Sequence, residues 1–147
     1  MATIVAEDIH VAVRSDADTV VARQAGRDAA LALGFSRTDA TFIATAISEI
    51  ARNITVHAGE GEVVICEVQT EGRRGLRVVA RDSGPGIRDV DAVMRQDYAS
   101  EAGLGMGIWG AMRLMDDVNV ASEPGHGTTV TMTKWRGFDE VEAFLRD

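Results

Sequence analysis

The sequence predicts an α/β (α+β) domain of two layers, with helices on one face of a mixed, mostly antiparallel sheet. A chain of 147 residues suits one domain with one hydrophobic core. Apolar residues recur every three or four positions in the N-terminal third and every second position later. The helical segments come mainly before and between pairs of strands, which favours a layered fold. We expect one domain over residues 1–147, with a core over 5–135 and a short helical tail over 136–147.

The composition predicts a soluble, cytoplasmic protein that binds neither nucleic acid nor a membrane. The formal net charge is −8, so the overall field would repel a phosphate backbone. Cys66 is the only cysteine, which excludes an intrachain disulfide. The charged first twenty residues are not a signal peptide, and no apolar run approaches the roughly 20 residues that a membrane helix needs.

The first 34 residues predict a strand followed by a helix. Ile9, Val11 and Val13 alternate within residues 4–13, as in a half-buried strand. Residues 15–18 offer several helix N-caps, and Gly34 is a natural stop for a helix that runs to about Leu33. The apolar residues expected near one side of this helix are Val20, Val21, Ala25, Ala29 and Leu33.

The next segment predicts a strongly amphipathic helix. Residues 36–39 can cap it, and residues 57–61 end it. Its apolar positions follow one another at spacings of three and four, which favours one buried face. They are Ala40, Ile43, Ala44, Ile47, Ile50, Ala51 and Ile54.

The second half of the chain predicts two strand pairs with helices between and after them. Strands are expected over 62–70 and 76–80, joined by a turn over 71–75, and again over 118–122 and 128–135. Short helices are expected over 89–94, 108–115 and 138–146. Trp109 is expected to pack in the core. The histidines His10, His57 and His126 lie near element ends and are interpreted as surface or turn residues.

Glu49 and Asn53 are the first candidate site residues. They are four positions apart, so both side chains lie on one side of the second helix, at the border of its apolar face. The amide oxygen of Asn53 suits Mg²⁺, and the carboxylate of Glu49 can take a proton from an attacking hydroxyl. A polar helix edge that faces water explains the same residues. Arg52 either pairs with Glu49 or meets a partner.

Asp82 is the second candidate. It continues the row of Leu76, Val78 and Ala80 at the end of a strand, where a carboxylate needs hydrogen-bond donors. An exocyclic amine such as that of adenine is one such donor. Gly84 and Gly86 allow a tight chain path beside a flat ligand, although an ordinary turn has the same composition.

Two glycine-rich segments complete the candidate site. The run Gly103-Leu104-Gly105-Met106-Gly107 directly precedes a predicted helix, and its backbone N–H groups with the helix dipole suit phosphate. A flexible loop is the alternative. The run 125–127 leads into a strand at Thr128, whose hydroxyl can reach a nucleotide or its water, although a hairpin explains these glycines too.

The order and spacing of these motifs resemble the GHKL ATPase superfamily, which includes the ATP domains of sensor histidine kinases, gyrase and Hsp90 and the anti-sigma serine kinases. The resemblance implies that Glu49 is the base, that Asn53 holds Mg²⁺ and that Asp82 reads the adenine of ATP. It also implies that Gly103, Gly105 and Gly107 close over the phosphates.

Residues 21–27, 45–53 and 113–116 resemble the RsbT-type switch kinases of the stressosome more narrowly. That likeness implies a serine/threonine kinase in a partner-switching stress response. Such kinases phosphorylate STAS-domain scaffold proteins, then bind the N-terminal region of a PP2C-type phosphatase and activate it. Two alternatives stay open. One is a module that uses nucleotide only to shape a partner surface, and the other is an anti-sigma factor kinase that sequesters its partner.

Overall fold

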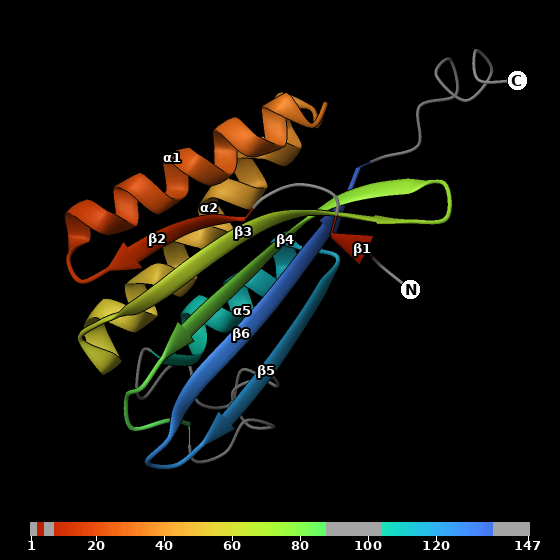
Figure 1. Ribbon diagram of the computed structural model, residues 1–147. Coiled ribbons are helices and arrows are strands. Elements are labelled where there is room, and N and C mark those ends of the chain that lie inside the picture. The colour runs from red at the N-terminus through yellow and green to blue at the C-terminus, as the bar shows by residue number, and fades with distance from the viewer. Residues whose placement is uncertain (1–2, 5–7, 88–103, 137–147) are drawn as a thin grey trace, which may run out of the picture.

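A computed structural model describes residues 3–4, 8–87 and 104–136 of the chain. Three helices, α1, α2 and α5, cover one face of a single sheet, so the expected two-layer fold class is confirmed (Figure 1). In the described residues every strand pairing is antiparallel, whereas the sequence suggested a mixed sheet. The helices predicted over 89–94 and 138–146 lie outside the described residues.

The sheet has six strands in the order β1-β3-β4-β6-β5, and β2 also pairs with β3. The strands are β1 (Thr3–Ile4), β2 (Ile9–Val13), β3 (Gly61–Thr70), β4 (Arg73–Asp82), β5 (Asp117–Glu123) and β6 (Gly127–Trp135). β1 and β2 therefore share one edge of β3, and the last residue of β4, Asp82, lies opposite Thr128 at the start of β6.

The turn between β3 and β4 is shorter than the sequence predicted. Thr70 pairs with Arg73, so only two residues connect the strands, and Gly75 lies within β4 opposite Val68. A Cβ on Gly75 would lie 2.7 Å from a ring carbon of Trp135. Gly75 thus gives the indole room on the sheet, and a glycine that suggests a turn in sequence marks a close approach in the fold.

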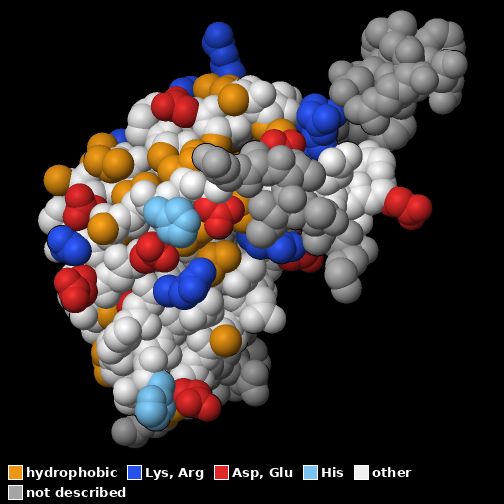
Figure 2. Space-filling model, viewed as in Figure 1, with side chains coloured by type: hydrophobic (Ala, Val, Ile, Leu, Met, Phe, Trp, Pro, Cys, Tyr) orange, Lys and Arg blue, Asp and Glu red, His pale blue; other side chains and the backbone are white. Residues whose placement is uncertain are grey.

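Helix α1 (Asp16–Ala32) begins where predicted, because the Ser15 hydroxyl accepts a hydrogen bond from the Asp18 N–H at 3.4 Å. Its expected apolar side is partly wrong. Val20 and Val21 are 52% and 55% exposed, and hydrophobic side chains reach the surface over this helix (Figure 2). The buried residues are Ala22, Gly26 and Ala30.

Small residues form that buried face because α1 packs closely on α2. A Cβ on Gly26 would collide with the end of the Ile47 side chain, which belongs to the core. Glycine at this position lets the two helices approach, and larger side chains are left on the outer side of α1.

Helix α2 (Arg37–Asn53) follows the sequence prediction closely. The Ser36 hydroxyl accepts from the Asp39 N–H at 3.1 Å, and all seven predicted apolar positions are buried. The helix continues into a π-helical turn, η1 (Ile54–Ala58), before Gly59 ends it at a φ of 87°. Single π-helical turns are rare and often occur at functional sites.

Helix α5 (Leu104–Leu114) begins four residues earlier than predicted. Ile108 and Ala111 point into the core, whereas Trp109 is only half-buried, with the Arg113 guanidinium 4.8 Å from its ring centre. The expectation that Trp109 packs in the core therefore holds in part. Of the helices in the described ranges, none has the length and apolar character needed to cross a membrane.

Candidate functional site

A cavity of about 120 Å³ opens at the end of the sheet where β4 stops. Ile50, Ile54, Ile108 and Val130 contribute apolar walls, and the polar lining comes from Asn53, His57, Asp82 and Thr128. A single water needs roughly 10–15 Å³ of such space, so the cavity has room for a flat ring. α2 with η1, the loop over 83–87, α5 and β6 all meet here.

Asp82 is half-buried at the last position of β4 and lines this cavity. The row of Leu76, Val78 and Ala80 that leads to it is buried, as the alternation predicted. One carboxylate oxygen, Oδ1, accepts a hydrogen bond from the Gly84 N–H at 2.9 Å. Because a carboxylate has about four acceptor positions, this bond orients Asp82 and leaves capacity for a donor in the cavity.

The loop over 83–87 is held against the β5–β6 hairpin. The Ile87 N–H donates to the Ser122 hydroxyl at 2.7 Å, and the Gly125 N–H donates to the Pro85 carbonyl at 2.7 Å. Ser122 also lies 2.9 Å from the Thr128 hydroxyl. Sequence reasoning placed Ser122 at the end of a strand but missed its role, because a serine at a strand end carries no functional signal by itself. Its place opposite Thr128 in the hairpin register is the signal that finds it.

Two glycines around Asp82 are explained by close chain packing. A Cβ on Gly84 would lie 2.6 Å from the Ala58 Cβ, so Gly84 lets the loop approach η1. Gly127 has a φ of 97°, and a Cβ there would collide with the Asp82 carbonyl oxygen. Gly86 lines the cavity itself, as a residue beside a flat ligand would.

Asn53 lines the cavity from the end of α2, whereas Glu49 lies one helical turn earlier. Both are half-buried. The Glu49 Cγ lies 4.0 Å from where a Cβ on Gly110 of α5 would be, so Glu49 faces α5. Arg52 is exposed, and no ion pair joins it to Glu49 in the described residues.

His57 is half-buried near the end of η1 and also lines the cavity, a place that its interpretation as a surface or turn residue did not include. The signal in the sequence is the four-residue spacing of Glu49, Asn53 and His57, which continues one side of α2 into η1.

The glycine cluster is placed in part. Gly103 lies outside the described residues, and residues 104–107 form the first turn of α5 instead of a loop before it. The first N–H groups of a helix have no partner within the helix and suit an anion. Ile108 follows directly and lines the cavity, so this helix start borders the site.

The donor set fits a magnesium ion that is held mainly by phosphates. Such an ion keeps several waters and takes only one or two protein oxygens, and the amide of Asn53, which lines the cavity, has an oxygen of this kind. Within the described ranges, the His, Cys, Asp and Glu side chains form no group of three or more that could hold a metal ion.

An apolar cavity with an oriented carboxylate, next to an amide and a helix N-terminus, is typical of a nucleotide-binding domain. The chain belongs to the family described as the histidine kinase-like ATPase domain, whose model matches residues 10–134. Use of ATP follows from that family.

Two similar proteins indicate which members of this family the chain resembles. The serine/threonine-protein kinase RsbT of Bacillus subtilis (strain 168) is 44% identical over 125 residues, which cover 85% of this chain and 94% of RsbT. The anti-sigma F factor of Thermoanaerobacter sp. (strain X514) is 33% identical over 103 residues, covering 67% of this chain and 71% of that protein. The likeness to the RsbT type that the sequence motifs indicated is thus confirmed.

Proposed function

We propose that this chain is an ATP-dependent serine/threonine kinase that phosphorylates STAS-domain scaffold or antagonist proteins in the cytoplasm. Once released, it binds the N-terminal region of a PP2C-type phosphatase and activates it. The kinase class rests on the identity to RsbT. The partners rest on the resemblance of the motif segments. The observation that carries the proposal is the meeting of Asp82, Asn53 and Thr128 in one cavity, with Glu49 one helical turn away.

In this mechanism the cavity holds the base of the nucleotide. The apolar walls take the faces of the ring, and Asp82 accepts a hydrogen bond from the exocyclic amine of adenine. Gly86 lets the loop lie against the ring, and Thr128 offers its hydroxyl to the nucleotide or to a bound water. Asp82 is already oriented by Gly84, so binding needs little rearrangement of this carboxylate.

The phosphates extend from this cavity toward the start of α5. There the backbone N–H groups of Leu104, Gly105, Met106 and Gly107 bind them, and we assign the same role to Gly103. Asn53 would hold Mg²⁺, and the bound ion would neutralise part of the phosphate charge. Glu49 orients the incoming serine or threonine hydroxyl and accepts its proton, and the hydroxyl oxygen then bonds to the γ-phosphorus as ADP leaves.

A second candidate is an anti-sigma factor kinase that sequesters its partner. It is favoured by the 35% identity over 101 residues to the anti-sigma F factor of Caldanaerobacter subterraneus subsp. tengcongensis, which covers 65% of this chain and 69% of that protein. A module that only binds nucleotide is disfavoured by Glu49, since a pure binding site has no need of a base.

Binding to three immobilised partners tests the partner assignment. The purified chain is offered a STAS protein, the N-terminal region of a PP2C-type phosphatase and a sigma factor, each with and without MgATP. We expect capture by the first two, with each displacing the other, and no capture by the sigma factor. Capture by the sigma factor alone would support the second candidate instead.

A further inference from the structure

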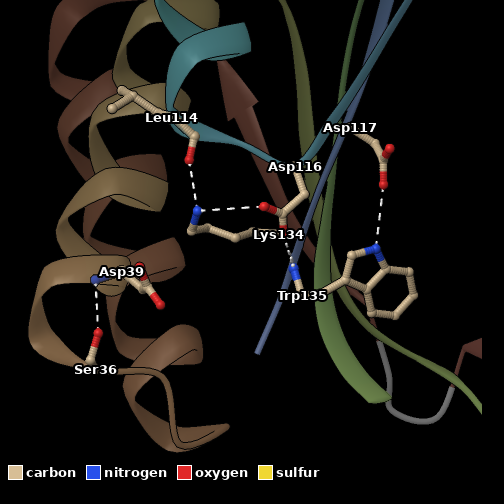
Figure 3. A network of polar contacts seen from close by, with 7 residues as sticks. All are labelled: Ser36, Asp39, Leu114, Asp116, Asp117, Lys134 and Trp135. Carbon is tan, nitrogen blue, oxygen red and sulfur yellow. Dashed lines mark hydrogen bonds and ion pairs between the residues drawn. The ribbon is translucent and has the colours of Figure 1, made fainter. Parts of the chain in front are cut away.

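Lys134 is a lysine of β6 that points toward the helical layer, with only 12% of its side chain exposed. Its Nζ donates to the Leu114 carbonyl at 2.9 Å and lies 3.9 Å from Oδ1 of Asp116 (Figure 3). An ammonium group is costly to remove from water, so this placement needs compensating partners.

Those partners are at the C-terminal end of α5. Leu114 is the last residue of that helix, and its carbonyl is one of the four that lack a partner within the helix. A cation there also meets the negative end of the helix dipole. Lys134 therefore caps α5 from the neighbouring strand.

The same ammonium group contacts three of the elements that line the nucleotide cavity. Lys134 is on β6, Leu114 ends α5, and the ring of Phe42 on α2 has its centre 5.7 Å from Nζ. At the other end of these elements, β6 contributes Thr128 and α5 contributes Ile108 to the cavity.

Asp116 completes the junction. Its Oδ2 accepts a hydrogen bond from the backbone N–H of Trp135 at 2.7 Å (Figure 3). The backbone N–H of Asp116 donates to the Thr133 carbonyl at 3.0 Å. The turn that follows α5 is therefore hydrogen-bonded to the residues of β6 on both sides of Lys134, Thr133 and Trp135. The C-terminal end of α5 is held in place, while its N-terminal end borders the site.

We propose that Lys134 is a positioning residue for nucleotide binding, which sets the place of α5 relative to α2 and β6 from the far end of the helix. The proposal rests on the proposed function in one respect, namely that the cavity binds ATP. A methionine would fill the same space, so the distinctive contribution of the lysine is the charged cap on α5.

The test compares Lys134→Met and Lys134→Arg with the wild-type chain by titration with a fluorescent ATP analogue and by kinase kinetics. We expect Lys134→Met to weaken nucleotide binding by about fivefold and to raise the KM for ATP, with kcat changed by less than about twofold. Lys134→Arg keeps a charged donor and is expected to restore affinity to within about twofold of wild type.

Ser15→Ala is the matched control, because it removes the N-cap of α1, a helix that contributes no residue to the cavity lining. It should lower the melting temperature and leave ATP affinity unchanged. If Lys134→Met does not fold, Lys134→Gln takes its place, with a loss of about threefold expected.

Wild-type affinity in the neutral Lys134 variant would overturn the inference, as would an equal loss of affinity in Ser15→Ala. Failure of the wild-type chain to bind ATP would instead contradict the proposed function. The two failures are therefore distinguishable in one titration series.

Discussion

Asp82 is placed by the strand that precedes it and oriented by the loop that follows it. The buried row of β4 leads the chain to it, and the Gly84 N–H orients one of its oxygens. Both effects are local, since an alternating strand followed by Asp-x-Gly produces them. This is why the sequence alone pointed to Asp82.

Asp82→Asn should weaken ATP binding by about 10- to 100-fold, because an amide NH₂ would replace an acceptor opposite the exocyclic amine of adenine. Calorimetric titration with ATP measures the change. Asp28→Asn removes the same charge from the exposed side of α1 and serves as the control. Unchanged affinity in Asp82→Asn would show that another group reads the base.

Cys66 is a buried residue of β3, and burial raises the pKa of its thiol. The nearby charge of Asp8 raises that pKa further, while Arg77 lowers it. The folded chain therefore holds the thiol proton to higher pH than the unfolded chain does. At pH below the unfolded pKa, the thiol is protonated in both states, so its ionisation does not change stability.

We expect stability to fall as pH rises above about 8.5, the ordinary pKa of a cysteine, because only the unfolded state then gains from ionisation. Alkylation at pH 8 should accordingly be slow in the folded chain and fast in denaturant. The rate of iodoacetamide labelling, followed by mass spectrometry, measures this. Equal rates in both states would contradict the burial of Cys66.

At the scale of elements, the loop over 83–87 depends on hydrogen bonds to the β5–β6 hairpin. Ser122 of β5 accepts the Ile87 N–H and contacts the Thr128 hydroxyl, so one side chain joins the loop to both strands of the hairpin. Loss of this hydroxyl leaves a buried N–H without its partner.

Ser122→Ala is expected to lower the free energy of unfolding by about 1–3 kcal/mol and to weaken ATP binding at the same time. Urea denaturation and nucleotide titration measure the two effects. Ser83→Ala, in the same loop but exposed, provides the comparison and should change neither quantity. If the two variants behave alike, the loop does not depend on the hairpin.

The sequence predicted elements well where their signals were local. The cap of helix α2 at Ser36 and its apolar spacing both lie within residues 36–54, and both were found. The side of α1 was predicted only in part, with Val20 and Val21 misplaced, because the contact of Gly26 with Ile47 is between two helices. The start of β4 was missed for the same kind of reason, since Gly75 lies beneath an indole that is 60 residues later.

At the scale of the whole molecule, the order of the motifs predicted the family, but the cavity itself is a tertiary property. Asn53, Asp82 and Thr128 are far apart in the chain and meet only because β4 and β6 are neighbours and α2 covers the same end of the sheet. The place of His57 in the cavity lining was overlooked because it depends on this arrangement. Ser122 was overlooked because its hydrogen-bond partners are on other segments.

The most direct measurement of the central claim is transfer of labelled phosphate from ATP to a STAS-domain protein in the presence of Mg²⁺. We predict rapid transfer by the wild-type chain and by Glu60→Gln, a variant at an exposed carboxylate outside the cavity. Glu49→Gln should still bind ATP and should lose transfer by about 100-fold or more. Transfer by Glu49→Gln at the wild-type rate, or no transfer by the wild-type chain to any STAS protein, would contradict the account.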